Sequence, residues 1–292
     1  MAPANLLDRA AMTGGSLFLV RWLKRFAALA VLFLLFIGYM YWTAISDPVV
    51  RRDTVHLAEW PKGTPPATIL IASDLHVAGP DMPPERVARI VAQINALKPD
   101  LILLAGDFIS DKTLATRHYS AAEALAPLAG LQPRWGTVAV LGNHDHWRDA
   151  AEVSAAIRAG GITLLDNQAV ARGPFVIGGV DDFFTAHADI PATERAMADY
   201  KGVPVMITHT PDLAPHLSQT IKLVAAGHTH CGQIRFPIFG AITYASSFGD
   251  RYACGKIVEG GRTIYVGAGL GTSNLPLRLG AVPDMWLVTV GR

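Results

Sequence analysis

Short runs of apolar residues recur along the chain, and each is followed by glycine or by a polar residue that does not continue it. Such runs predict strands that are buried on both faces. The clearest lie at 67–72, 101–105, 137–141, 203–208 and 222–226. Further strands are predicted at 162–165, 175–178, 263–266 and 285–290.

Helical periodicity appears between these runs. From 83 to 97, four apolar residues recur at helical spacing and form one stripe. They are Val87, Ile90, Val91 and Ile94. Further helices are predicted at about 120–129 and 149–159. Strands that alternate with helices indicate an α/β protein built from βαβ units.

The N-terminal part has a different pattern. The segment from Phe26 to Ile45 contains no charge, and its length matches the roughly 20 residues with which a helix crosses a bilayer. Arg21, Lys24 and Arg25 precede it, and basic residues favour the cytoplasmic side. We therefore expect a single-pass protein of the inner (cytoplasmic) membrane, with residues 1–25 in the cytoplasm and the remainder on the periplasmic or extracellular side.

Two alternatives stay open for this segment. It could be a cleaved signal peptide, although its apolar run is long and no clean small-residue cleavage site follows. It could also be an anchor for a cytoplasmic domain, because Arg51 and Arg52 weaken the charge difference. Residues 46–65 are predicted to be a linker, with an edge strand near Val55 to Ala58, before a single domain at 66–292.

Composition narrows the possible partners. The chain of 292 residues has 51% hydrophobic content and a net charge of +1, which suits one large globular core. Nucleic-acid binding depends mainly on phosphate electrostatics, and the sequence has no basic stripe to supply it. We therefore expect no nucleic-acid partner, and the sequence leaves the oligomeric state open.

Polar motifs follow five of the predicted strands. They are Asp74-Leu75-His76, Gly106-Asp107, Gly142-Asn143-His144-Asp145, Thr208-His209 and Gly227-His228-Thr229-His230. Because the carboxyl ends of parallel strands meet at one edge of a sheet, these side chains are expected to converge. Residues two apart in an extended segment point to the same side, so each D-x-H or H-x-H pair can bind one ion.

The residue types indicate a metal centre. The candidate ligands are Asp74, His76, Asp107, Asn143, His209, His228 and His230. Imidazole, carboxylate and amide groups together suit Mn, Fe or Zn. Two such cations roughly 3.5–4 Å apart would activate water against a phosphate ester, with Asp107 as the natural bridging ligand. The glycines at 106, 142 and 227 are expected where the backbone turns close to the ions.

These motifs, in this order, resemble those of the calcineurin-like metallophosphoesterases, whose pattern is D-x-H, G-D, G-N-H-D/E, H and G-H-x-H. The resemblance covers roughly residues 65–290 and implies a four-layer αββα sandwich. It implies that Asp74, His76, Asp107 and His230 bind one metal. It implies that Asp107, Asn143, His209 and His228 bind the other, with a metal-bridging hydroxide as the nucleophile.

The same resemblance separates His144 from the ligands. It implies that His144 contacts the phosphate, together with Asn143, and assists the leaving group. Histidine titrates near neutral pH, so an imidazole beside a phosphate can donate a proton to the departing alkoxide. Asp145 is expected to hold His144 in one tautomer and orientation.

Other polar residues have weaker signals. His56, His118, His187 and His216 match no motif and are expected in loops or at the surface. His146 is adjacent to the site and could touch substrate, as could the loop 180–184. Arg148 and Arg278 are candidate phosphate contacts. Residues 269–278 resemble the glycine-rich C-terminal segment of a membrane-associated bacterial branch, and they lack the ending of a P-loop.

The two cysteines, Cys231 and Cys254, allow two interpretations. An exported domain could pair them in a disulfide. The interpretation favoured here is that Cys231 is an unpaired small residue beside the metal site, without a role as a ligand.

The sequence thus predicts a membrane-anchored, metal-dependent phosphoesterase, with phosphodiester or lipid-linked substrates favoured. An anchor near the bilayer raises the local concentration of such substrates. A UDP-2,3-diacylglucosamine pyrophosphohydrolase of lipid A synthesis is the enzymatic alternative, although that nucleotide-sugar lipid is cytoplasmic. A non-catalytic scaffold is the alternative of another class, and it would be expected to lack a ligand or the general acid.

Overall fold

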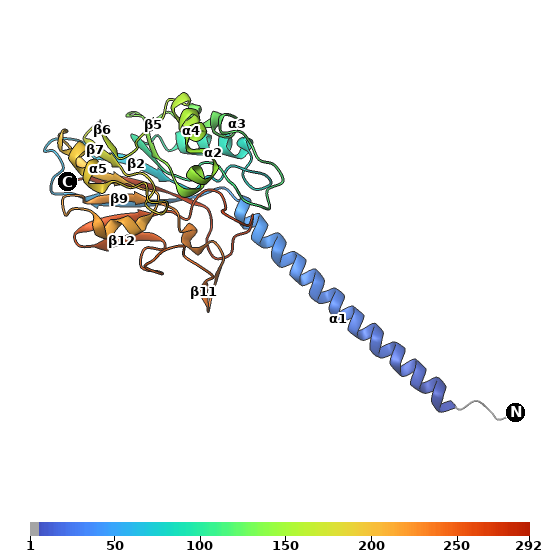
Figure 1. Cartoon of the computed structure of the whole chain (residues 1–292). Helices are drawn as coiled ribbons and strands as arrows, with labels where there is room; N and C mark the ends of the chain where they lie inside the picture. The colour runs from blue at the N-terminus through green and yellow to red at the C-terminus, as the bar shows by residue number, and fades with distance from the viewer. Residues whose placement is uncertain (1–5) are drawn as a thin grey trace.

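The computed structural model describes residues 6–292, with side chains from residue 18 onward. Residues 1–5 of the predicted cytoplasmic segment lie outside the described residues. The long helix α1, Leu6–Ile45, projects from a folded domain (Figure 1). Its part Phe18–Ile45 contains the predicted span and is long and apolar enough to cross a membrane. Most of this part is exposed, so α1 is not a core helix of the domain.

Two six-stranded sheets form the centre of the domain. The first has the order β1-β14-β2-β3-β4-β5, with bounds Val49–His56, Asp284–Gly291, Ala67–Ala72, Leu101–Ala105, Thr137–Val140 and Thr163–Leu164. The second has the order β12-β13-β9-β8-β7-β6, with bounds Gly255–Glu259, Arg262–Val266, Leu223–Ala226, Val203–Ile207, Phe175–Gly179 and Gln168–Arg172. Strands β2, β3 and β4 are parallel, as are β7, β8 and β9.

The sheets pack face to face through alternate residues of their strands. In β2, Ile69 and Ile71 belong to the cluster between the sheets, whereas Leu70 and Ala72 belong to the cluster under the helices. This alternation follows from the two-residue period of a strand. Because both faces are covered, each central strand needs apolar residues at every position, which is why these strands read as continuous apolar runs.

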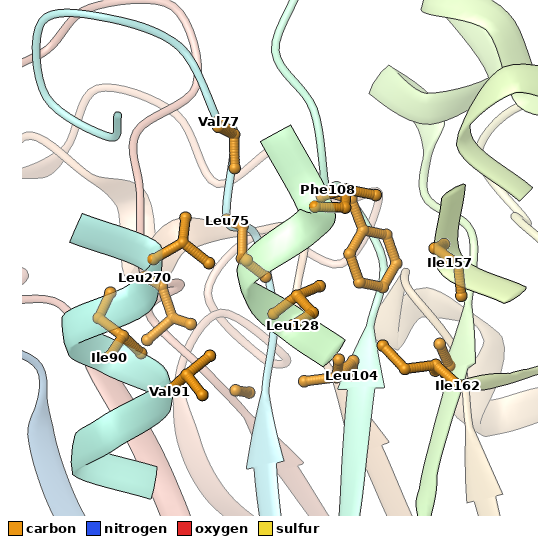
Figure 2. Packing of buried hydrophobic residues seen from close by; sticks show 14 of the residues in the cluster. Leu75, Val77, Ile90, Val91, Leu104, Phe108, Leu128, Ile157, Ile162 and Leu270 are labelled. Carbon is orange, nitrogen blue, oxygen red and sulfur yellow. The ribbon is translucent and has the colours of Figure 1, made fainter. Parts of the chain in front are cut away.

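Helices cover the outer faces and complete four layers. On the first sheet lie α2 (Pro84–Ala96), α3 (Ala121–Leu125), the 3-10 helix η1 (Ala126–Gly130) and α4 (Asn143–Ala159). On the second sheet lie α5 (Ile190–Ala198) and the 3-10 helix η2 (Pro211–His216). Figure 2 shows Ile90 and Val91 of α2 beside Leu128 and Leu104. The predicted αββα sandwich is therefore confirmed.

Several short or marginal elements were not predicted. Strands β6 and β12 lie at the edges of the second sheet and are only partly buried, so their sequences mix apolar and polar residues. Helix α5 begins after Asp189, whose side chain accepts a hydrogen bond from Ala192 N. The remaining short elements are the 3-10 turn η3 (His230–Gly232) and the hairpin strands β10 (Arg235–Phe236) and β11 (Gly240–Ala241).

Residues 46–65 are not a linker. Strand β1 pairs in parallel with β14 along its whole length, and Trp60 is 2% exposed with its ring centroid 5.4 Å from that of Phe175. The prolines and charges of this segment concealed the strand, because an edge strand tolerates charge on its open side. The folded domain therefore begins near residue 49.

Replacing Trp60 with alanine tests this boundary. The variant should lose about 3–5 kcal/mol of unfolding free energy, since a large side chain is removed from the core. Chemical unfolding of the purified chain in detergent measures the change. Val258→Ala, at a position that is 68% exposed on β12, is the matched control and should stay within roughly 0.5 kcal/mol of the parent. Equal stability of the two variants would restore the linker interpretation.

Candidate metal centre

The polar motifs converge at one edge of the sandwich, where parallel strands of both sheets end. The predicted ligands are Asp74 and His76 after β2, Asp107 after β3, Asn143 after β4, His209 after β8, and His228 and His230 after β9. All seven side chains are buried. The strand order of each sheet places these ends beside one another, so the seven predicted ligands come together across the seam between the sheets.

Asp107 lies at the middle of this group. Its Oδ2 is 3.3 Å from His76 Nε2 and 3.2 Å from His209 Nε2. Its Oδ1 accepts a hydrogen bond from the backbone N of His144 at 2.9 Å. One carboxylate oxygen thus faces an imidazole on each side, which is the position of a bridging ligand.

Two sets of donors surround Asp107. On one side, His230 Nε2 lies 3.0 Å from His76 Nε2 and 3.4 Å from Asp74 Oδ1. On the other side, His209 Nε2 lies 3.1 Å from both Asn143 Oδ1 and His228 Nδ1. The close groups of possible ligands are Asp74 with His76 and His230, His76 with Asp107 and His144, and Asp74 with Asp107 and His209, so Asp74 and Asp107 each belong to two groups.

Hydrogen bonds from outside each set fix which ring nitrogen is available. His209 Nδ1 lies 2.8 Å from Ala105 O and His228 Nε2 lies 3.0 Å from Ala245 O, so each N–H donates to a carbonyl. The opposite nitrogen of each ring, His209 Nε2 or His228 Nδ1, is directed into the site. Burial alone would lower the pKa of His209, but the Asp107 and Asp74 carboxylates raise that pKa well above its usual value, so His209 Nε2 must lose a proton when it binds a cation. A carbonyl partner of this kind commonly orients a metal-binding histidine.

The donor set fits a cation. Burial lowers the pKa of His76 and of His230 well below the usual value, so both rings are neutral at neutral pH. Within the described residues, Nδ1 of each ring is buried without a hydrogen-bond partner. The two Nε2 atoms face each other at 3.0 Å, and a single N–H shared between them would still leave Nδ1 of both rings without a partner. A divalent ion between them would accept both lone pairs.

The carboxylates carry the negative charge of the site. Burial alone would raise the pKa of Asp107, but His209, through its charge and a side-chain hydrogen bond, outweighs burial and holds that pKa well below its usual range. Burial, reinforced by the Asp107 carboxylate, raises the pKa of Asp74 to about 6. Burial also lowers the pKa of His228 to about 4, with nearby His209 adding to the effect. A neutral His228 and an ionised Asp107 are the forms that bind metal.

The backbone of the ligand loops corrects one sequence-based argument. Asp74, His76, Asp107, His228 and His230 all have φ between 46° and 70°, in the left-handed region. The D-x-H and H-x-H pairs therefore converge through tight turns rather than through extended alternation. Left-handed backbone is uncommon for residues other than glycine and is concentrated at functional sites, where the surrounding structure holds it.

Two glycines make room for ligand carboxylates. A Cβ at Gly142 would lie 2.3 Å from Asp107 Oδ1, and a Cβ at Gly227 would lie 2.4 Å from Asp74 Oδ2. Gly106 has a φ of +81° and turns the chain into Asp107, and a Cβ there would lie 2.8 Å from His209 Nδ1. All three glycines predicted near the ions thus provide clearance, and Gly106 also provides a left-handed backbone conformation.

His144 lies at the rim of this group with a partner that was not predicted. Its Nδ1 contacts the Asp111 carboxylate, and its Nε2 is 3.4 Å from Ser273 Oγ. Asp145 instead accepts backbone hydrogen bonds from Phe108, Ile109 and Gly142, so it fastens the turn after β3 to the start of α4. The orienting contact expected from Asp145 is therefore made by Asp111, which no motif marked.

Aromatic side chains flank the site. The exposed ring of Trp147 lies 4.9 Å from that of His144, and the exposed ring of Phe184 lies 4.9 Å from that of His228, measured between centroids. Phe184 belongs to the loop 180–184, which therefore reaches the site as the sequence suggested. His146 instead pairs with Asp181 and stacks on His187, beside the site rather than in it.

Two further expectations are corrected. Arg278 is fully buried and donates to the carbonyls of Ala268, Gly269, Gly271 and Ala281, so it supports the glycine-rich segment and does not face substrate. Arg148 is exposed.

Cys231 and Cys254 form a disulfide. The interpretation of Cys231 as an unpaired residue was wrong, because the loop after His230 folds back onto Cys254.

A family model for calcineurin-like phosphoesterases matches residues 67–232, more than half of the chain. The chain belongs to the calcineurin-like phosphoesterase family. It is a phosphoester hydrolase with a candidate divalent metal centre at the residues described above. The family resemblance expected from the five motifs is confirmed.

Curated relatives agree with this family. The uncharacterized metallophosphoesterase YkuE of Bacillus subtilis is 30% identical and aligns with 87% of this chain and 90% of its own. Phosphodiesterase YaeI of Escherichia coli is 31% identical, over 86% of this chain and 91% of its own. A transmembrane protein with metallophosphoesterase domain from Danio rerio is 28% identical over 81% of this chain, which spans 56% of that protein.

Asp111→Asn tests the contact to His144. The substitution should lower turnover roughly 10–100-fold, because an uncharged amide orients the imidazole poorly, while the melting temperature stays unchanged since Asp111 lies at the surface. Steady-state kinetics and thermal unfolding measure the two effects. Asp199→Asn, exposed at the end of α5, should change neither. Full turnover of the Asp111 variant would remove this residue from the mechanism.

Proposed function

We propose that this chain is a dinuclear-metal phosphodiesterase that hydrolyses lipid-linked phosphate esters at the outer face of the membrane. The observation that carries the proposal is the position of Asp107 Oδ2, within 3.3 Å of His76 Nε2 and 3.2 Å of His209 Nε2. A carboxylate between two sets of nitrogen and oxygen donors is what a pair of cations requires. Manganese, iron and zinc all suit this donor set.

In this proposal each cation has its own ligand group. Asp74, His76, Asp107 and His230 hold one, and Asp107, Asn143, His209 and His228 hold the other. The bound ions would supply Lewis-acid polarisation of the phosphoryl oxygens and water of lowered pKa. The support for this division is the grouping of distances on the two sides of Asp107.

The remaining groups of the site act on the substrate. His144 stays outside both ligand groups and donates a proton from Nε2 to the departing oxygen. Asp111, on the Nδ1 side, keeps the ring oriented. Ser273 Oγ lies near His144 Nε2, where it can form a hydrogen bond to a phosphate oxygen or to the leaving group. Asn143, whose amide oxygen faces His209, keeps its NH₂ group for a phosphoryl oxygen.

A cavity beside the ligands favours a substrate with an apolar part. It has a volume of about 290 Å³, and His228 and His230 contribute to its lining. Ile234, Ile242 and Leu275 supply apolar wall, and Ser273 and Asn274 supply polar groups, of which Ser273 lies near His144. Apolar walls with a few polar groups are typical of pockets that bind organic ligands. A phosphodiester that carries an acyl or prenyl chain has this combination.

Three features support the membrane location and its side. Helix α1 is long and apolar enough over Phe18–Ile45 to cross a membrane, and all its basic residues precede the uncharged run 26–45. The Cys231–Cys254 disulfide is of a kind that persists in oxidising compartments outside the cytoplasm. A relative from Danio rerio carries the word transmembrane in its name. The proposed orientation is single-pass, with the domain in the periplasmic or extracellular space.

Metal removal tests the catalytic part. The purified full-length chain with added Mn²⁺ should hydrolyse bis(p-nitrophenyl) phosphate, and EDTA should abolish that activity until Mn²⁺ is restored. Asp107→Ala should lose metal, measured by elemental analysis, as well as turnover. His144→Ala should keep its metal and still lose turnover by at least roughly 100-fold, as for a general acid. Unchanged turnover in either variant would contradict the mechanism.

A fusion experiment tests the orientation. Alkaline phosphatase joined after Arg292 should be active, because that enzyme folds only where disulfides form, and a green fluorescent protein joined there and exported in the unfolded state should be dark. Activity staining and fluorescence of intact cells give the two readouts. The reverse result, a silent phosphatase with a bright fluorescent fusion, would place the site in the cytoplasm and favour a UDP-2,3-diacylglucosamine pyrophosphohydrolase.

A further inference from the structure

The β10–β11 hairpin, residues 235–242, exposes apolar side chains at its tip and along its strands. Ile238 and Phe239 are each 87% exposed and Ile242 is 71% exposed, and Phe236 is also exposed. The hairpin is a separate two-stranded sheet that belongs to neither layer of the sandwich. Single exposed apolar residues are common, but a group of them on one projecting element marks an interaction site.

The stem of this hairpin is bonded to the end of α1 through one short segment. Arg235 N donates to Leu279 O at 2.7 Å, and Leu279 N donates to Gln233 O at 2.9 Å. The neighbouring Arg278 N donates to Met40 O in the last turns of α1 at 3.0 Å. The buried guanidinium of Arg278 holds this segment through backbone carbonyls. The position of the hairpin relative to α1 is therefore fixed.

The end of α1 also indicates where the membrane surface lies. Tyr39 and Trp42 are exposed on either side of the buried Met40, and such aromatic residues gather at the membrane–water interface. The hairpin projects from the side of the domain from which α1 leaves (Figure 1). Its tip is about three residues beyond the stem, or roughly 10 Å at the rise of a strand. Interfacial segments enter a bilayer by roughly 5–10 Å.

From this placement we propose that the β10–β11 hairpin inserts Ile238 and Phe239 into the headgroup and acyl boundary of the bilayer that holds α1. The exposed tip contacts lipid because α1, a membrane-spanning helix bonded to the stem of the hairpin, brings the membrane surface to the level of the hairpin. Arg235, exposed at the base of the hairpin, would lie at the height of the lipid phosphates.

This contact has a consequence for the metal site. Ile234 and Ile242, at the two ends of the hairpin, line the cavity that contains His228 and His230. An inserted tip holds the mouth of that cavity at the lipid surface, so a lipid-linked phosphate can enter without leaving the bilayer. This second step rests on the proposed function as a whole, whereas insertion of the tip rests only on the part of it that places α1 across the bilayer.

Photocrosslinking tests insertion directly. Benzoylphenylalanine replaces Phe239 in the full-length chain, which is reconstituted in vesicles of phosphatidylethanolamine and phosphatidylglycerol and irradiated. Mass spectrometry should show phospholipid adducts at this position. The matched control carries the same group in place of Val258, which is 68% exposed on β12, and should show none. A crosslinked dimer, an adduct to another protein, or no adduct at position 239 would overturn the proposal.

A double variant separates insertion from catalysis. Ile238→Ser with Phe239→Ser should leave the melting temperature and the turnover of bis(p-nitrophenyl) phosphate unchanged. In the same vesicles, turnover of a fluorescent phosphatidylglycerol should fall at least tenfold, and Val258→Ser should have no effect. Lipid turnover equal to the parent's would contradict the role of the hairpin. A parent chain that forms lipid adducts but hydrolyses no lipid would refute the proposed substrate and leave insertion standing.

Discussion

The metal centre depends on burying charged and polar side chains at the seam between two sheets. A buried carboxylate is costly unless nearby charges and hydrogen bonds compensate it. Asp107 meets this condition through two imidazoles and a backbone N–H. The fold satisfies the rest with main-chain groups, since Ala105 and Ala245 supply carbonyls to the histidines. The ligand loops therefore require the strands to end where they do, and glycine at 142 and 227.

The sequence predicted the parts of the molecule whose signals are local. A buried strand followed by a polar motif can be read from a few consecutive residues, so the central strands were predicted correctly, and the seven predicted ligands lie together at the ends of those strands. The role of Asp111 was not predicted because its partner, His144, is distant in the sequence and lies on another element. The pairing of Cys231 with Cys254 likewise depends on the path of an irregular loop. Strand β1 was mistaken for a linker because its apolar side is visible only beside β14.

The glycine-rich segment 269–278 connects the metal centre to helix α1. At one end, Gly271 N donates to Asp74 O at 2.7 Å, and at the other Arg278 N donates to Met40 O. Arg86 adds a second connection, since its guanidinium donates to Ser46 O just after α1 and to Leu270 O. Buried arginines that satisfy several carbonyls can fix irregular backbone as firmly as a regular ladder does. The orientation of the site relative to α1 is thus part of the fold.

The order of the strands in the first sheet also constrains how the chain folds. Strand β14 lies between β1 and β2, so the first strand after the apolar helix reaches its sheet only through residues 284–291. Contacts between distant parts of a sequence form slowly, since a long loop must close before they contribute. The first sheet is therefore incomplete until nearly the whole chain has been made. A chain exported during synthesis would cross the membrane before it could fold, which is the form a narrow translocation channel accepts.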